Sequence, residues 1–152
     1  MNATPMNPEY AAAAIDDYRK NGDPVAVTFR VWNAFNNDYE MRTVHGRKAH
    51  ANPYAGTLSV YGGENGATWT RHYPLADVLA VGAVSPGDVV RTLKRGDRVY
   101  VRKYGSDYAG HVVETLKTRV RVRFTLASGK SREVTVNALD LLPSWGARLS
   151  AR

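Results

Sequence analysis

The sequence predicts a mainly β protein with one short N-terminal helix followed by two small antiparallel β units in tandem. Apolar and polar residues alternate with a period of two in several short segments between residues 25 and 136. Turn-forming residues, rich in Gly, Asn and Pro, separate these segments. The order of strand, turn, strand and closing turn recurs in the second half at an offset of 62 to 63 residues. The chain of 152 residues has room for two small domains.

The N-terminal segment, residues 1–22, is predicted to contain the helix. Asn7, Pro8 and Glu9 read as an N-cap, a first helical position and an early acid. Apolar residues follow at helical spacing, at Ala11, Ala14, Ile15 and Tyr18. Lys20-Asn21-Gly22 is expected to end the helix, which should pack its small apolar stripe against the next element.

Residues 23–88 are predicted to form the first β unit. Val25, Val27, Phe29 and Val31 share one face of its first strand. The expected strands are 25–31, 39–45, 56–61 and 67–73. Residues 48–55 are expected to be a loop, residues 74–81 to close the unit, and residues 85–87 to form a turn or a short linker.

Residues 89–143 are predicted to form the second β unit, which repeats this plan. The expected strands are 98–102, 110–116, 119–126 and 131–136. Residues 103–109 are expected to be a loop, and residues 137–143 to close the unit. A short tail, residues 144–152, follows, and its Trp145 is expected to fold back onto the second unit.

The second unit resembles the SH3-like small β-barrels of the Tudor and KOW type. Over residues 94–143 the resemblance is carried by Gly96-Asp97-x-Val99-x-Val101, Gly110-x-Val112, Val120-x-Val122-x-Phe124, Gly129-Lys130 and Leu139 to Leu142. The first unit, over residues 25–81, is similar to a second SH3-like barrel or to the Sm-like variant through Gly46, Gly56-x-Leu58-x-Val60 and Pro74-Leu75-x-Asp77-Val78. The resemblance implies two tandem barrels that bind nucleic acid or peptide segments without catalysis.

Charge is concentrated in one part of the chain. The formal net charge is +7 and the pI is about 9.8. Residues 91–132 contain twelve basic and only three acidic residues, so this segment carries more than the whole excess. A local basic surface of this kind favours a polyanionic partner.

Other features of the composition narrow the class of protein. The chain has no cysteine, which excludes disulfides, thiolate metal ligands and cysteine nucleophiles. The sequence shows neither a secretion signal nor an apolar stretch long enough to span a membrane. We therefore expect a cytoplasmic protein that does not bind membranes.

The predicted binding residues lie in the basic segment. A strand over residues 119–126 places Lys117, Arg119, Arg121 and Arg123 in one row while Val120, Val122 and Phe124 face the core. Like charges in file repel one another, and phosphates would relieve that repulsion. The full predicted set is Arg98, Tyr100, Arg102, Tyr104, Tyr108, Lys117, Arg119, Arg121, Arg123, Lys130 and Arg132. The alternative interpretation is a solvated face whose cations protect a sheet edge.

The tyrosines have three possible roles. Tyr100 shares the outer side of its strand with Arg98 and Arg102, an arrangement typical of surfaces that stack bases. Tyr104 and Tyr108 are expected to stack on bases or ribose from the loop that follows. They could instead form an aromatic cage for a methylated cation, as the Tudor resemblance implies, or be ordinary half-buried loop residues.

No catalytic or metal-binding pattern is found. The four histidines, His45, His50, His72 and His111, do not have the spacing of a metal site. Gly129-Lys130-Ser131 looks like the end of a phosphate-binding loop, but a hairpin turn explains it. We expect a protein that is not an enzyme and needs no cofactor or metal.

The predicted function is non-catalytic nucleic-acid binding, to DNA or RNA, with little sequence specificity. The alternative is a protein-interaction module, such as a bacterial or phage accessory protein that docks on an acidic protein surface or joins an assembly. An enzyme would require at least two of His45, His72 and His111 to converge with a carboxylate in one pocket.

Overall fold

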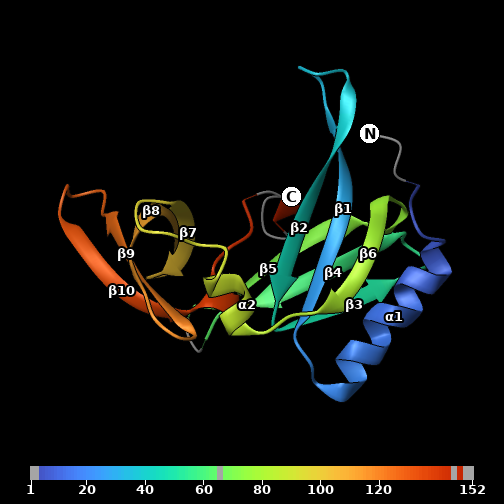
Figure 1. Ribbon diagram of the computed structural model, residues 1–152, viewed down its shortest axis with the longest axis horizontal. Helices are drawn as coiled ribbons and strands as arrows, with labels where there is room; N and C mark the ends of the chain where they lie inside the picture. Colours follow the sequence, from blue (N-terminus) through green and yellow to red (C-terminus); the bar gives the residue numbers. More distant parts are fainter. Residues whose placement is uncertain (1–3, 65–66, 145–146, 149–152) are drawn as a thin grey trace. The chain divides into compact units, whose positions relative to one another are not determined.

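The computed structural model describes residues 4–64, 67–144 and 147–148, and these form two compact units (Figure 1). The first unit contains residues 4–61, 70–83 and 147–148. The second contains residues 62–64, 67–69 and 84–144. The helix thus belongs to the first unit, and residues 84–88 belong to the second. The fold is mainly β, as predicted, with three antiparallel sheets.

The predicted N-terminal helix is confirmed as α1 (Pro8–Asn21). The side chain of Asn7 accepts a hydrogen bond from the Glu9 N–H at 2.8 Å, which caps the first turn. Gly22 ends the helix in the left-handed conformation, with a φ of 71°. Ala11 and Ile15 are fully buried, and the helix packs against strands of its own unit (Figure 1).

The first unit is built from two sheets and a short helix. Its elements are β1 (Val25–Asn33), β2 (Asp38–Gly46), β3 (Lys48–Asn52), β4 (Thr57–Gly62), β5 (Trp69–Pro74), η1 (Leu75–Asp77), β6 (Val78–Ala83) and β11 (Ala147–Arg148). One sheet has the order β2-β1-β6 and the other the order β11-β5-β4-β3. The expected loop over residues 48–55 is wrong in its first part, because β3 occupies that stretch and pairs with β4.

The core of the first unit is centred on stacked aromatic rings. Val25, Val27 and Phe29 are buried on one face of β1, as the period of two predicts. The ring of Phe29 stacks on that of Tyr73, with centroids 4.9 Å apart. Both side chains are almost fully buried, so this pair holds the two sheets of the unit together.

The outer half of the β1–β2 hairpin exposes large apolar side chains. The hairpin extends beyond the other strands of its unit (Figure 1). Trp32 and Met41 are half exposed or more, and Phe35, at the tip, is fully exposed. Trp32 meets the ring of Tyr39 edge to face at 5.2 Å, and the guanidinium of Arg30 lies 4.5 Å from the centroid of the Tyr39 ring. The sequence analysis did not single out these residues.

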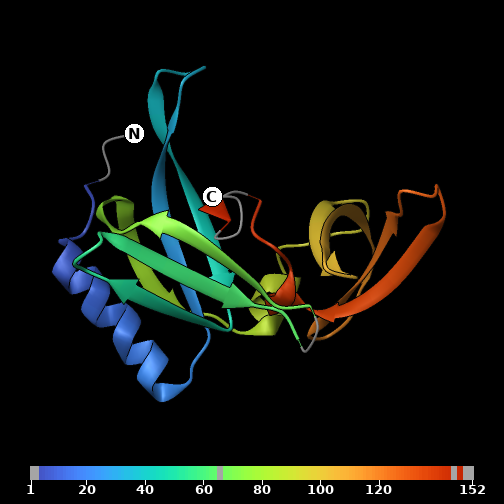
Figure 2. The same ribbon diagram turned by 180° about the vertical axis from the view of Figure 1, so that it is seen from behind.

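The second unit contains one bent four-stranded sheet with two short helices. Its elements are α2 (Pro86–Val90), β7 (Arg98–Lys103), β8 (Ser106–Thr115), β9 (Arg119–Thr125), β10 (Ser131–Asn137) and η2 (Ala138–Asp140). The strand order is β10-β9-β8-β7, and the strands curve strongly around the core (Figure 2). The turn expected at residues 85–87 is the start of α2, where Ser85 and Asp88 form a capping box.

The core of the second unit follows the predicted alternation. Val99, Val101, Val112, Val120, Val122 and Phe124 all lie in one buried cluster. After η2 the chain returns to β7, where the Leu142 N–H donates to the Tyr100 carbonyl at 2.8 Å. None of the three sheets is closed into a barrel, so the tandem SH3-like barrels are not confirmed. Trp145 and most of the expected tail lie outside the described residues.

Gly110 fixes the close approach of β8 to β9. A Cβ placed there would lie 2.6 Å from the Arg123 carbonyl oxygen and 2.8 Å from a Val122 methyl. Gly110→Ala is therefore expected to destabilise the second unit by about 1–3 kcal/mol, because the strands must move apart. Gly82→Ala is the matched control, since a Cβ there meets nothing within 4 Å. Urea unfolding of both variants checks this; equal stabilities would contradict it.

Candidate nucleic-acid interface

The predicted row of arginines exists on β9. Arg119, Arg121 and Arg123 alternate with Val120, Val122 and Phe124, whose side chains are at most 3% exposed. The three arginine side chains are 43%, 43% and 58% exposed. Lys117, the fourth predicted member, lies exposed in the turn before β9. Because the apolar residues between them are buried in the core, the three arginine side chains lie on the opposite side of the sheet.

The strand register extends this row across the sheet. We call the side of the second unit's sheet that faces away from its core the outer face. Cross-strand partners share a face, so Arg98, His111, Arg123 and Glu133 form one line over all four strands. The outer face consists of Arg98, Tyr100, Arg102, Asp107, Ala109, His111, Glu114, Arg119, Arg121, Arg123, Thr125, Ser131, Glu133, Thr135 and Asn137.

Carboxylates on the neighbouring strands neutralise part of this positive charge. Arg121 pairs with Glu114 and also lies 3.6 Å from Glu133. Arg123 donates from Nε to Glu133 at 3.0 Å. That hydrogen bond, with the positive charges of Arg123 and Arg121, holds the pKa of Glu133 below its usual value, so the carboxylate is ionised at neutral pH.

The repulsion expected within the row of arginines is therefore partly relieved inside the protein. The row was expected to require an external anion, but Glu114 and Glu133 supply anions within the sheet. Arg119 lies 3.9 Å from a third carboxylate, that of Glu64. The outer face is still basic, because its five arginines outnumber its three carboxylates, those of Asp107, Glu114 and Glu133, but the excess is smaller than the sequence indicated.

Several cations of the second unit have no carboxylate within ion-pair distance among the described residues. They are Lys94, Arg95, Arg98, Lys103, Lys117, Lys130 and Arg132. Four of them, Arg98, Lys117, Lys130 and Arg132, were predicted to contact phosphates. Arg102, also predicted, is held by Asp107 at 2.9 Å. The unpaired cations can meet an anion without breaking a native ion pair.

The three predicted tyrosines have different surroundings. Tyr100 is half-buried on the outer face, with the Arg98 guanidinium 5.7 Å from its ring centroid. Tyr104 is 64% exposed in the turn between β7 and β8, with a φ of 53°. Tyr108 lies on the core side, where its ring centroid is 4.8 Å from that of Phe124.

The expected loop over residues 103–109 is wrong. β7 ends at Lys103 and β8 begins at Ser106, so only a two-residue turn joins the strands. Tyr108 is therefore part of a strand and packs with the core, which removes it from the base-stacking surface. An aromatic cage formed by Tyr104 and Tyr108 gains no support, because one ring is at the turn and the other packs on Phe124.

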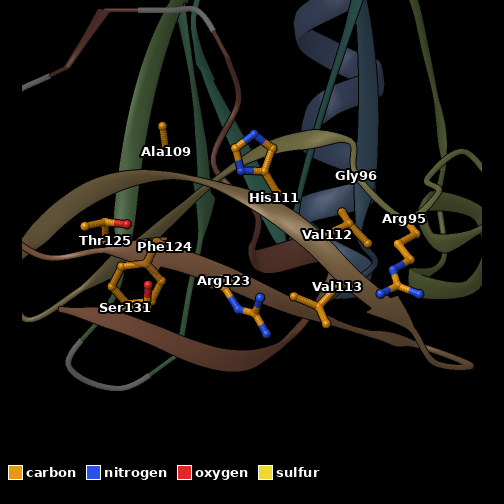
Figure 3. A pocket seen from close by; sticks show the side chains of 10 residues that line it. All are labelled: Arg95, Gly96, Ala109, His111, Val112, Val113, Arg123, Phe124, Thr125 and Ser131. Carbon is orange, nitrogen blue, oxygen red and sulfur yellow. The ribbon is translucent and has the colours of Figure 1, made fainter. Parts of the chain in front are cut away.

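A shallow pocket of about 420 Å³ lies on the outer face beside β8 and β9 (Figure 3). Small side chains, Ala109, Thr125 and Ser131, leave the space. Arg95, His111 and Arg123 also line it, and His111 is exposed. The strand register places Arg98 directly across from His111.

Sequence analysis missed Arg95 and His111 as members of the site. Arg95 stands in the turn before β7, and no periodicity indicates where a turn residue points. His111 had a usable signal, because it lies one residue before buried Val112 and hence on the outer face. A β-bulge between Val112 and Glu114 then shifts the register, which the sequence does not reveal.

No similar protein was found for this chain. No protein-family model, curated protein or solved structure matches the chain. The function must therefore be argued from the residues and their geometry. In the described part of the chain, neither helix is long and apolar enough to cross a membrane.

The histidines form one notable contact away from the outer face. Ser59 Oγ and His72 Nδ1 are 2.8 Å apart in the first unit. No carboxylate is hydrogen-bonded to the ring of His72 at its other nitrogen, which is buried. Among the described residues, no three His, Cys, Asp or Glu side chains gather to hold a metal ion. Among the described residues, the Ser59–His72 pair therefore lacks the third group of a hydrolytic triad.

Proposed function

We propose that the protein binds nucleic acid without catalysis and with little sequence specificity, through the outer face of the second unit. The observation that carries the proposal is that Arg95, His111 and Arg123 line one pocket, while Arg98 lies directly across from His111 on the outer face. In the part of the chain that the structure describes, Arg95 and Arg98 have no carboxylate partner, so their charge is available to phosphates.

Of the other predicted cations, Lys117 and Lys130 lie exposed in the turns before and after β9, and Arg132, the cross-strand partner of Phe124, lies on the side of β10 opposite the outer face. Arg98, Lys117, Lys130 and Arg132 offer unpaired charges, whereas Arg102, Arg119, Arg121 and Arg123 must share theirs with nearby carboxylates. Tyr100 and Tyr104 remain available for stacking on bases or ribose. Guanidiniums that meet phosphates and rings that meet base faces discriminate poorly between sequences, so specificity should be low.

The SH3-like small barrel remains our proposal for the fold family of each unit. In the second unit, four meandering strands, a 3-10 helix and the return of Leu142 to β7 support the Tudor and KOW type. In the first unit, support comes from the N-terminal helix and from the pairing of β6 with β1 after a 3-10 helix, an order compatible with an SH3-like or Sm-like barrel. Such folds host many functions, so this likeness adds little to the functional argument.

Removing the two glutamates of the outer face tests the proposal. Glu114→Gln/Glu133→Gln is expected to tighten binding of a 5′-hydroxyl oligonucleotide about 3- to 10-fold, because it releases Arg121 and Arg123. Asp16→Asn/Glu40→Gln is the matched control: it removes the same charge from ion-paired, partly exposed carboxylates of the first unit. Fluorescence anisotropy measures both. Equal changes in the two variants, or no binding by any form at low salt, would count against the proposal.

A second candidate function is that of a protein-interaction module. The exposed Trp32, Phe35 and Met41 of the β1–β2 hairpin favour it, because aromatic residues and methionine are enriched at protein interfaces. Trp32→Ser/Phe35→Ser should leave oligonucleotide binding unchanged and abolish co-purification of a protein partner that survives nuclease treatment. Loss of oligonucleotide binding in this variant would instead place the hairpin in the nucleic-acid site.

A further inference from the structure

We propose that the pocket lined by Arg95, His111 and Arg123 is a subsite for a phosphate monoester carried by a nucleoside, at the end of a strand or in a free nucleoside monophosphate. This inference rests on the proposed function, because it assigns a particular group to the same outer face. The pocket lies wholly within the second unit, where four segments of the chain contribute to it.

The charge around the pocket suits a dianion better than a single negative charge. Among the described residues, Arg95 and Arg98 have no carboxylate within ion-pair distance, and Arg123 pairs with Glu133. His111 stands between Arg98 and Arg123 in the cross-strand register, so its ring can donate a hydrogen bond to an anion held by these arginines. A phosphate monoester carries about −1.5 to −2 at neutral pH, whereas each phosphodiester within a strand carries −1.

The chemistry of the lining also suits phosphate. Thr125 and Ser131 contribute exposed hydroxyl groups, which can donate to phosphate oxygens while the guanidiniums bind bidentately. The small side chain of Ala109 gives the ligand room to approach the backbone of β8. Together these side chains offer more hydrogen-bond donors than the two non-bridging oxygens of a phosphodiester can accept.

The size of the pocket leaves room for more than the phosphate. A volume of about 420 Å³ lies within the range of small-molecule sites. Tyr100 is directly across the strands from Ala109, so its ring stands next to the pocket on the outer face. A nucleoside attached to the bound phosphate would therefore find an aromatic side chain and the Arg98 guanidinium beside it.

The ion-paired row on β9 explains why an internal phosphate should be held less well there. Arg121 interacts with both Glu114 and Glu133, and Arg119 is near Glu64. A diester on this row must compete with these carboxylates, and gains less than a dianion gains at Arg95 and Arg98. The preference for a strand end thus follows from where the carboxylates lie.

The test compares oligonucleotides of one sequence that carry a phosphate at the 5′ end, at the 3′ end or at neither. We expect a terminal phosphate at one or both ends to tighten binding at least about fivefold over the hydroxyl form. Arg95→Gln/His111→Gln should abolish that gain and weaken binding of the hydroxyl form only about two- to threefold. Arg19→Gln/His50→Gln, which changes the same residue types on exposed positions of the first unit, should keep the gain.

Adenosine monophosphate, adenosine and inorganic phosphate, used as competitors, separate the possible outcomes. Equal binding of phosphate and hydroxyl ends, or a preference that survives Arg95→Gln/His111→Gln, would overturn the inference while the proposed function stands. Binding of adenosine monophosphate, lost in that variant, with no binding of any oligonucleotide, would overturn the proposed function and leave a free nucleotide as the ligand. Binding of inorganic phosphate as tightly as adenosine monophosphate would remove the nucleoside from the inference.

Discussion

Arg95→Glu/Arg98→Glu is expected to weaken oligonucleotide binding about 30- to 100-fold. Each reversal removes one charge-assisted phosphate contact and adds a repulsive carboxylate on the outer face. Neither residue has a carboxylate partner among the described residues, so the variant breaks no ion pair of the folded second unit. Fluorescence anisotropy with a 5′-hydroxyl single strand at low salt measures the loss.

The control for this variant is Arg19→Glu/Lys20→Glu on α1, which changes the net charge by the same amount. Both side chains are exposed and pair with Asp16, far along the sequence from the basic segment. If binding is governed only by the total charge of the protein, the two variants will lose affinity equally. That result would remove the outer face as the binding surface.

Phe29→Ala is expected to destabilise the first unit by about 3–5 kcal/mol. The side chain is 0% exposed and stacks on Tyr73, so its truncation leaves a cavity as well as lost apolar contact. The free energy of opening can be measured by hydrogen exchange of the β1 amides, which report on the first unit alone.

Phe35→Ala provides the comparison within the same strand pair. Its ring is fully exposed at the tip of the β1–β2 hairpin, so its removal should change stability by less than about 0.5 kcal/mol. If the two variants have similar stabilities, the stacked pair does not hold the core of the unit as described.

The sequence predicted those parts of the fold that depend on local pattern. The cap of α1 follows from Asn7 and Pro8, and the buried face of β9 follows from alternation around Val122. Both features are set by neighbours a few residues apart. The row of arginines was predictable for the same reason. The valines between the arginines are buried in the core, and successive residues of a strand point to opposite faces, so the arginines must lie on the outer face.

Features that depend on register or on turn type could not be predicted. Tyr104 adopts a positive φ in a two-residue turn where Asn or Gly is usual, so the sequence indicated a loop and misplaced Tyr108. Glu114 and Glu133 meet the arginines only through cross-strand register and a bulge. The pocket requires four segments to come together, and no spacing along the chain reveals that.

The dependence of binding on salt tests the central claim most directly. For a 5′-hydroxyl single strand, the logarithm of the association constant should fall against the logarithm of salt concentration with a slope of about −3 to −4, as about five phosphate contacts produce. Arg95→Glu/Arg98→Glu should make the slope shallower by about 1.4, because two contacts are lost. A slope near zero, or the same slope in both proteins, would contradict phosphate binding at the outer face.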